Sequence, residues 1–175
     1  MIITIGGKPV AGKGSVGRAL AKHLGYEYLS IGDIWRVKAQ EHNMTLNEFH
    51  VYCRTHPEYD RSIEDYQRGL RDHPGLVLDG RLGFYTIPSS FKVYLDVSVE
   101  EACRRLVEAN RRNEKATTIQ EAREEITTRA RHETEKHLQQ YGVDPHNLKQ
   151  FDLVIDTTHK SVDSVVKEIL THAKL

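Results

Sequence analysis

The stretch that decides the fold is IGGKPVAGKGSVGRAL, residues 5–20. It continues the apolar run MIITI at residues 1–5, which predicts a buried strand. The apolar residues that then recur at helical spacing are Val16, Ala19, Leu20 and Leu24. Gly25 is placed to end this helix. The stretch therefore predicts a strand, a glycine-rich loop and a helix in direct succession.

The loop carries two glycines five positions apart and a lysine after the second, Gly7-x-x-x-x-Gly12-Lys13. Between a strand and a helix, this pattern is typical of a phosphate-binding loop, because glycines let successive N–H groups converge and the helix N-terminus adds positive charge. The alternative is a glycine turn with a solvated lysine, and motif and context together favour the phosphate loop. We expect ATP to contact Gly7, Lys8, Pro9, Val10, Ala11, Gly12, Lys13, Gly14 and Ser15.

Two positions depart from the commonest form of such loops. Gly14 follows the lysine, so the hydroxyl of Ser15 comes one place later, as it does in adenylate kinases. This favours Mg²⁺ held through water by Ser15 and by Asp79 over direct ligation. Val10 stands where such loops often have glycine, so we expect a backbone there that suits a β-branched residue. Neither an Asn-Lys-x-Asp base reader nor an Asp-x-x-Gly switch turn is found, which favours a transferase over a GTPase switch.

The composition excludes several classes of protein. The 175 residues, 38% hydrophobic and 29% charged, suit one domain with a core, and a net charge of zero does not favour long nucleic acid or an anionic membrane. Cys53 and Cys103 have no metal-type spacing and are expected to be free thiols. No apolar run is long enough to span a membrane, and the first residues leave no room for a signal peptide. We therefore expect a cytoplasmic location.

Short apolar runs alternate with helical periodicities along the chain. After residues 1–5, the further strand candidates are YEYLS (26–30), GLVLDG (75–80), FKVYLDVS (91–98) and FDLVIDTT (151–158). This alternation predicts an α/β fold in which a parallel sheet has helices on both faces.

The helices between the strands have recognisable start signals. Capping boxes are expected at Thr45-x-x-Glu48, Ser98-x-x-Glu101 and Thr118-x-x-Glu121. Pro57 begins a helix that runs to about residue 72, and its inward side chains are expected to be Ile63, Tyr66 and Leu70. Residues 108–142, rich in Arg, Glu and Thr, predict a helical segment that stands partly away from the core.

Charged residues lie just past two strand ends, where open α/β sheets bind ligands. Arg36 follows the second strand, Arg81 follows the third, and Asp79 ends the third strand. Taken singly, Arg36 fits a surface helix and Asp79-Gly80 fits a simple turn. Together with the glycine loop, they indicate a site that handles phosphate groups.

Several longer segments carry a resemblance to a known family. They are GYEYLSIGDIWRVKAQEHNMTLNEF (25–49), HPEYDR (56–61), LVLDGRLG (76–83), FKVYLDVS (91–98), YGVD (141–144) and FDLVIDTT (151–158). Their order and spacing, over nearly the whole chain, resemble the cytidylate kinases of the short, archaeal type within the nucleoside monophosphate kinase family.

The resemblance implies ATP as donor, CMP or dCMP as acceptor, and Mg²⁺. It also implies a P-loop NTPase fold, a three-layer α/β/α sandwich with a five-stranded parallel sheet of order 2-3-1-4-5 and a moving helical lid. Residues 1–175 would form one monomeric domain. Its parts would be a core at about 1–30, 74–107 and 150–175, acceptor-binding helices at about 31–73 and a lid at about 108–149.

Individual roles follow from the same resemblance. The lid pattern Arg-Asp-x-x-Asp-Ser-x-Arg matches RARHETEK, residues 129–136, with Arg129 kept, Glu133 for Asp and Lys136 for the last Arg, while Ala130 lacks the carboxylate. Ile31 stands where bacterial members have serine. The expected catalytic residues are Lys13, Arg81 and Arg129. The expected acceptor-binding residues are Ser30, Gly32, Asp33, Arg36, Asp79, Gly80, Arg81, Arg131, Glu133 and Lys136.

The sequence gives less support for a functional role of the other basic residues. Arg111, Arg112 and Arg123 are expected to lie on a solvated helix face. Arg131 fits either a solvated face or the acceptor site. The ten histidines are expected to be solvated rather than metal-binding. Two alternatives remain at this stage: a kinase for another small acceptor such as UMP or AMP, and a protein that binds ATP without transferring phosphate.

Overall fold

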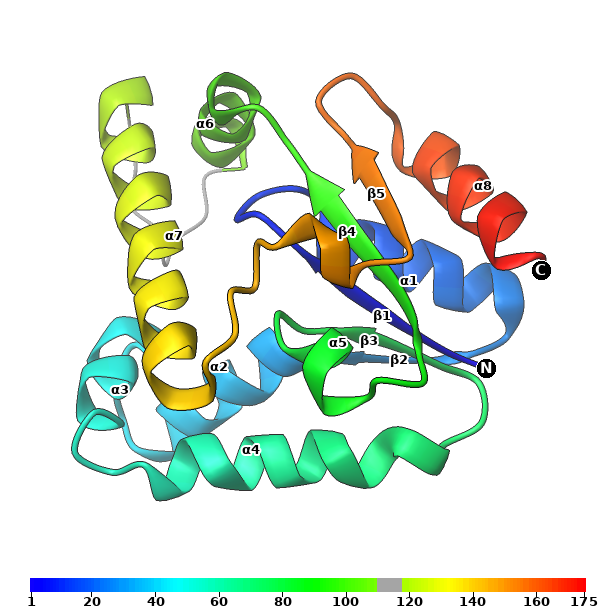
Figure 1. Ribbon diagram of the computed structural model, residues 1–175. Coiled ribbons are helices and arrows are strands. Elements are labelled where there is room, and N and C mark those ends of the chain that lie inside the picture. Colours follow the sequence, from blue (N-terminus) through cyan, green and yellow to red (C-terminus); the bar gives the residue numbers. More distant parts are fainter. Residues whose placement is uncertain (110–117) are drawn as a thin grey trace.

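The computed structural model describes residues 1–109 and 118–175. Within them, five parallel strands form one sheet of order β2-β3-β1-β4-β5 (Figure 1). The strands are Ile2–Gly7 (β1), Glu27–Ser30 (β2), Leu76–Asp79 (β3), Phe91–Asp96 (β4) and Leu153–Asp156 (β5). The predicted parallel sheet and its strand order are confirmed.

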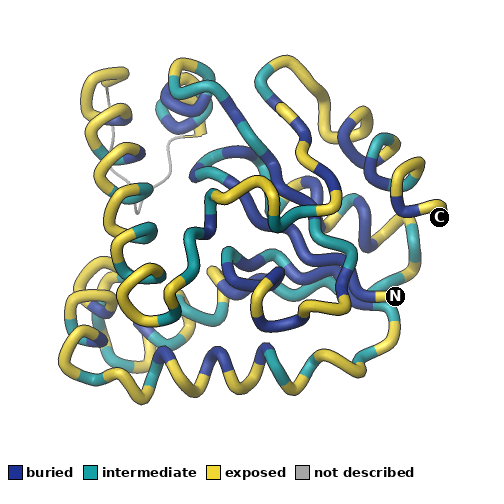
Figure 2. Tube along the Cα trace, viewed as in Figure 1, coloured by how far each residue is buried: buried dark blue, intermediate teal, exposed yellow. Residues whose placement is uncertain are grey.

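Each face of the sheet is covered by helices. Helices α1 (Lys13–Leu24) and α8 (Val162–Ala173) pack on the face that carries Ile3 and Ile5. Ile2, which points the other way because side chains alternate along a strand, lies in a second apolar cluster with residues of α4 (Glu58–Gly69). The result is a three-layer sandwich around a buried sheet, as Figure 2 shows.

The remaining elements surround the carboxyl ends of the strands or connect the layers. They are α2 (Ile31–Glu41), α3 (Leu46–Tyr52), α5 (Gly83–Thr86), α6 (Val99–Glu108), α7 (Ile119–Tyr141) and two 3₁₀ turns at Leu70–Asp72 and Leu148–Gln150. No helix among the described residues combines the length and the apolar composition needed to cross a membrane.

Two of the three predicted capping boxes are complete. At the starts of α3 and α7, the Thr45 and Thr118 hydroxyls accept from the N–H three residues on, and Glu48 and Glu121 return to the N-cap backbone. At α6, Ser98 accepts from the Glu101 N–H, but the Glu101 carboxylate binds arginines instead. This third box is therefore only half formed.

Helix α7 stands beside the sheet, as the sequence predicts for this segment (Figure 1). Only Ala122 and Ile126 of its residues are buried. The predicted lid, about 108–149, also includes residues 110–117, and with them Arg111 and Arg112, which lie outside the described residues.

The prediction that Tyr66 faces inward is wrong. Tyr66 is 49% exposed, whereas the buried residues of α4 are Asp60, Ile63, Glu64 and Gln67. Apolar spacing misidentified the buried face because three of the four residues on it are polar.

Gly7 permits a close approach between β1 and β4. Its φ of +137° is unfavourable for other residues, and an added Cβ would lie 2.2 Å from the carbonyl oxygen of Leu95. Gly25 has φ +66°, but an added Cβ there would meet nothing within 4 Å.

Gly7→Ala is therefore expected to lower the free energy of unfolding by about 3 kcal/mol or more, because strain and a backbone clash add. Gly25→Ala, which adds only left-handed strain, is expected to cost about 1 kcal/mol. Denaturant unfolding of both variants measures the difference. Equal costs would show that the approach of the two strands is not restrictive.

Candidate functional site

The glycine loop leaves the N-terminus of α1 open. Gly12 is the N-cap residue, has φ 87° and makes no side-chain capping hydrogen bond. A Cβ added at Gly12 would meet nothing within 4 Å, so the space in front of the helix is free. The first N–H groups of an α-helix have no partner within the helix and attract anions. The loop therefore has the form of an anion site.

The loop backbone is strained at one position. Val10 has φ 62°, in the left-handed region, so the expectation of a backbone suited to a β-branched residue is wrong. Such a conformation costs a non-glycine residue roughly 1–2 kcal/mol. The Val10 side chain packs against the main apolar cluster, and this contact offsets part of the cost.

Lys13 folds back over the loop. Its Nζ donates hydrogen bonds to the carbonyl oxygens of Gly7, at 2.9 Å, and Lys8, at 2.7 Å. Burial and the neighbouring Arg81 guanidinium lower the pKa of Lys13 to about 8. The Lys8 side chain is directed elsewhere, to Asp96 at the end of β4, at 2.6 Å.

Two arginines meet at a single carboxylate beside Lys13. Arg81, from the turn after β3, binds Oε1 of Glu133 at 2.5 Å, and Arg129, one turn earlier on α7, lies 3.2 Å from the same atom. Burial lowers the pKa of Arg81. Nε of Arg81 and Oε2 of Glu133 are buried without a hydrogen-bond partner. The fold thus brings Lys13, Arg81 and Arg129 together, as a phosphate group requires.

Asp79 and Ser15 are the two residues that the sequence predicts to hold Mg²⁺. Asp79 ends β3 and accepts a hydrogen bond from the Tyr28 hydroxyl at 3.2 Å. Burial, with the Asp79 charge second, raises the pKa of Tyr28 to about 12, so Tyr28 remains a donor. Ser15 is exposed in the first turn of α1. A hydroxyl and a carboxylate are the hard oxygen groups that suit Mg²⁺ and its bound waters.

Most of the other predicted acceptor residues lie at the start of α2, and Gly80 lies in the turn after β3. The Ser30 hydroxyl caps α2 by accepting from the Asp33 N–H at 3.3 Å, and Asp33 pairs with the exposed Arg36. Gly32 lies beside this pair, since its added Cβ would be 3.6 Å from an Arg36 nitrogen. Gly80 allows β3 to pass close to Ile31.

The two remaining predicted residues, both on α7, differ in direction. Lys136 binds Asp60 of α4 at 2.5 Å and lies 5.3 Å from the centre of the Trp35 ring. Arg131 is 67% exposed in its side chain and pairs with Glu135 at 4.0 Å. Lys136 therefore points toward α4 and α2, whereas Arg131 lies at the exposed surface of α7. Arg123 is exposed and pairs with Glu100, as expected of a solvated face.

A cavity of about 470 Å³ lies on the other side of the loop. It is lined by Ala11, Gly12, Ser15, Val16, Glu101, Arg104, Arg105, Val165 and residues 157–162. Its position next to the start of α1 suits the remainder of a nucleotide whose phosphates occupy the loop.

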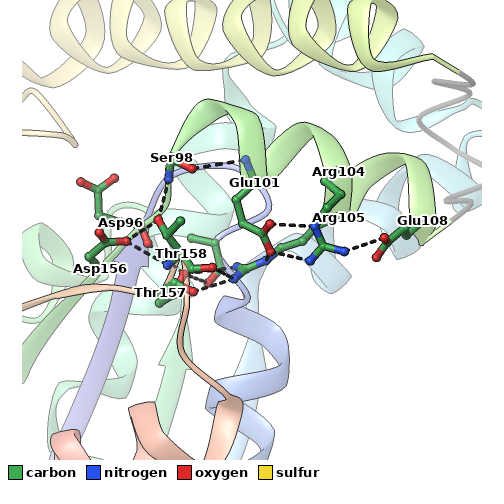
Figure 3. Close-up of polar contacts among 10 residues, drawn as sticks. Asp96, Ser98, Glu101, Arg104, Arg105, Glu108, Asp156, Thr157 and Thr158 are labelled. Atoms are coloured by element: carbon green, nitrogen blue, oxygen red, sulfur yellow. Dashed lines mark hydrogen bonds and ion pairs between the residues drawn. The ribbon is translucent and has the colours of Figure 1, made fainter.

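A hydrogen-bond network forms one wall of this cavity (Figure 3). Glu101 holds Arg104 and Arg105, and Arg105 donates to the carbonyl oxygen of Thr157 at 2.6 Å. The Thr157 hydroxyl donates to the carbonyl oxygen of Ala11 at 3.1 Å and so ties the wall to the loop. Sequence reasoning missed these residues because it placed Thr157 inside the strand candidate 151–158, whereas β5 ends one residue before it, at Asp156.

The expectation of solvated histidines is wrong for several of them. Nδ1 of His137 is buried without a hydrogen-bond partner, and burial lowers its pKa to about 4. His146 contacts the Tyr94 hydroxyl at 2.7 Å, and burial lowers its pKa as well. His42 and His56 stack on Phe49 and Tyr52 in the aromatic cluster of α2 and α3.

The lowered pKa of Lys13 makes a prediction about the ligand-free protein. In the unfolded chain the pKa is 10.5, so below pH 8 both states are protonated and the full cost of burying the charge is present. Between pH 8 and 10.5 the unfolded chain binds more protons, and stability gains as pH rises. Lys13→Met buries no charge and avoids this cost, so it is expected to melt ~3 °C above the wild type at pH 7.

The measurement is the melting temperature without nucleotide from pH 6 to 10. The advantage of Lys13→Met should shrink as pH rises through 8 to 10, and Lys22→Met, an exposed change on the same helix, should show no such trend. An advantage that stays constant with pH would mean that Lys13 is not destabilised by burial.

The chain has close relatives in sequence and in structure. Residues 2–159 match the model of the Cytidylate kinase-like family. The chain is 31% identical to the cytidylate kinase of Pyrococcus furiosus over 98% of its own length and 89% of that protein. It is 36% identical, over 97% of its length, to the S-adenosylmethionine-dependent nucleotide dehydratase of Lacinutrix mariniflava, of which it spans only 35%.

Solved structures agree with this fold. The shikimate kinase of Bacteroides thetaiotaomicron aligns over 100% of this chain and 99% of its own, with a TM-score of 0.70 and 16% identity, which shows the fold alone. The sequence relatives also show the family, and the resemblance found from the motifs is confirmed. With its glycine loop, strand order and basic cluster in place, the chain belongs to the cytidylate kinase-like family.

Proposed function

We propose that the chain is a nucleoside monophosphate kinase that transfers the γ-phosphate of ATP to CMP or dCMP. Family membership and the kinase fold support a phosphotransferase that uses a nucleotide. The observation that carries the proposal is that Arg81 and Arg129 meet at the Glu133 carboxylate, and that all three are near enough to Lys13 of the glycine loop to act on its pKa. A protein that only held ATP would not need arginines from the turn after β3 and from α7 to meet there.

The two substrates would lie on opposite sides of this cluster. ATP would place its phosphates in the loop at residues 7–15 and its nucleoside in the cavity beside Arg105 and Thr157. The acceptor would lie between the turn after β3, the helices at about residues 31–73 and α7. The sheet with α1, α6 and α8 would be the rigid core, and α7 part of the lid.

Phosphoryl transfer depends on in-line positioning and on neutralising charge. An oxygen of the acceptor phosphate attacks the γ-phosphorus, a new P–O bond forms, the bond to the β-phosphate oxygen breaks, and ADP leaves. The attacking oxygen is already anionic, so no general base is needed. Lys13, Arg81 and Arg129 would stabilise the charge on the moving group.

Glu133 would change partners during this cycle. Glu133 pairs with both arginines, and a bound phosphate group is expected to replace it. Its neighbour by one helical turn, Arg129, would move with α7 as the lid closes and excludes water, which is a competing acceptor.

Mg²⁺ fits the oxygen groups at this site. Ser15 and Asp79 would hold it through water, with Tyr28 fixing the Asp79 carboxylate by the 3.2 Å hydrogen bond. When bound, the ion would neutralise phosphate charge and orient the β- and γ-phosphates. Ser15 and Asp79 lie on α1 and β3, so the proposed Mg²⁺ site contains no residue of the lid.

One relative suggests a wider role for this kind of domain. The chain corresponds to about a third of the Lacinutrix mariniflava nucleotide dehydratase, so a similar segment is part of a longer protein that acts on nucleotides. We infer that a nucleotide is the substrate class that the two proteins share. The remaining alternatives are transfer to another small acceptor and ATP binding without transfer.

The test of the proposed function is ADP release from ATP and Mg²⁺ with CMP, dCMP, UMP, AMP and GMP as acceptors. We expect a clear preference for CMP or dCMP, and loss of transfer in Lys13→Ala with the fold retained. Preference for a different nucleotide would keep the kinase and reject the cytidylate assignment. ATP binding without turnover for every acceptor would favour the non-catalytic alternative.

Arg81→Ala separates a catalytic role from acceptor binding. If the guanidinium contacts the moving phosphoryl group, kcat is expected to fall ~10²–10³-fold. Arg123→Ala, which removes an exposed arginine paired with Glu100, is the matched control and should leave kcat unchanged. A rise in KM alone would limit Arg81 to binding the acceptor.

A further inference from the structure

The Thr157 side chain reaches the glycine loop from near the other end of the chain. Thr157 directly follows β5 and is 3% exposed. Its hydroxyl lies 3.1 Å from the carbonyl oxygen of Ala11, 146 residues earlier, and Ala11 is 1% exposed. Within residues 1–109 and 118–175, no other group donates a hydrogen bond to this carbonyl. The Thr157 hydroxyl thus satisfies a buried acceptor that would otherwise be left without a partner.

The Thr157 hydroxyl is itself held in place. Arg105 of α6 donates to the hydroxyl oxygen at 3.3 Å and to the Thr157 carbonyl oxygen at 2.6 Å (Figure 3). The hydroxyl has one proton and two carbonyl oxygens within reach, Ala11 at 3.1 Å and Asp96 at 2.9 Å. The Asp96 oxygen already accepts from the Thr157 N–H at 2.9 Å. The hydroxyl proton is therefore needed at Ala11.

Holding the Ala11 carbonyl also sets the direction of the Gly12 N–H. Both groups belong to one planar trans peptide, in which the C=O and the N–H point in opposite directions. The Gly12 N–H therefore points away from Thr157, and among the described residues it has no backbone acceptor. The space at Gly12 is open, since an added Cβ would meet nothing within 4 Å. This N–H is one of those that the start of α1 offers to an anion.

The loop needs such an anchor because the residue before Ala11 is strained. Val10 has φ +62°, a conformation that persists only where the surrounding contacts impose it. Across this turn the Ala11 N–H donates to the Lys8 carbonyl oxygen at a long 3.4 Å, and Lys13 donates to the same oxygen at 2.7 Å. In the proposed reaction the Lys13 ammonium serves the phosphates. The Thr157 hydrogen bond has no such second duty and can hold the loop throughout.

We propose that Thr157 is a positioning residue for the phosphates of the donor nucleotide, an inference that rests on the proposed ATP-dependent kinase. Its hydroxyl holds the Ala11–Gly12 peptide so that the Gly12 N–H points at the phosphate chain. Thr157 acts through the loop and not by contact with the phosphates. The affinity for ATP thus depends on a side chain that follows β5, whereas the affinity for the acceptor does not.

The test is Thr157→Val, which keeps the β-branched shape and removes the hydroxyl. Calorimetric titration with ATP and Mg²⁺, without acceptor, is expected to show ~10-fold weaker binding, because the Ala11–Gly12 peptide loses one net hydrogen bond. Thr157→Ser, which restores the hydroxyl, should bring the affinity back to within ~2-fold of the wild type. The KM for CMP should stay that of the wild type in both variants.

Thr86→Val is the matched control. Thr86 is 1% exposed, and its hydroxyl donates to the Leu82 carbonyl oxygen at 3.1 Å, the distance found between Thr157 and Ala11. This variant also loses a buried hydrogen bond, but in α5, and should keep the affinity for ATP. Melting temperatures without nucleotide show that the variants are folded. Thr157→Ala removes the same hydroxyl without added bulk and replaces Thr157→Val if that variant does not fold.

Inorganic tripolyphosphate separates an effect on the loop from an effect on the cavity that Thr157 also lines. It carries the phosphate chain of ATP without the nucleoside. Measured as a competitor of ATP, it is expected to bind ~10-fold more weakly to Thr157→Val, as ATP does. Weaker ATP with unchanged tripolyphosphate would place the action of Thr157 at the nucleoside and overturn the proposal.

The remaining outcomes separate the two levels of inference. A wild type that binds ATP but phosphorylates no nucleotide overturns the kinase, and the titrations still decide the role of Thr157. Unchanged ATP affinity in Thr157→Val, no recovery in Thr157→Ser, or an equal loss in Thr86→Val overturns the positioning role alone. Weaker binding of both ATP and tripolyphosphate, confined to variants without the Thr157 hydroxyl, supports it.

Discussion

The parallel pairing of β1 with β3 on one side and β4 on the other is the constraint on which the structure depends. Parallel strands end at the same edge, so the residues after each strand are brought together whatever their distance in sequence. The glycine loop after β1 lies in the middle of this edge. The N–H of Lys8 donates to the Leu95 carbonyl at 3.1 Å, which continues the sheet into the loop and fixes where the loop begins.

The cations of the site are held by the protein's own oxygens. Lys13 has two loop carbonyls, and Arg81 and Arg129 share the Glu133 carboxylate. Unpaired charges in such a position would carry a large desolvation penalty. Binding of a phosphate group, as proposed, would then exchange one set of oxygens for another around the same cations.

Much of the fold could be predicted from local patterns. Apolar runs locate the five strands, glycine spacing locates the loop, and Thr-x-x-Glu locates the starts of α3 and α7. These features depend on neighbours a few residues apart. Val10 is an exception, since its left-handed backbone results from the whole path of the loop and not from its own preference.

The parts of the site that escaped prediction depend on distant contacts. Arg105 meets Thr157, 52 residues away, and nothing near either residue indicates the other. The direction of Arg131 follows from helix geometry, since two positions along a helix point away from each other, and Arg129 faces the site. The buried polar residues of α4, Asp60, Glu64 and Gln67, escaped because apolar periodicity assumes that a buried face is apolar.

Because the Glu133 carboxylate pairs with both Arg81 and Arg129, an anion that binds these arginines must compete with it. An ion must displace it from both guanidiniums at once, because the same Oε1 faces Arg81 and Arg129. A chloride ion carries one charge and no fork of oxygens, so it gains nothing over the resident group. A phosphate monoester brings two charges and three oxygens and matches both arginines. If this site binds the acceptor phosphate as proposed, the internal ion pair would favour a phosphate monoester over monovalent anions such as chloride.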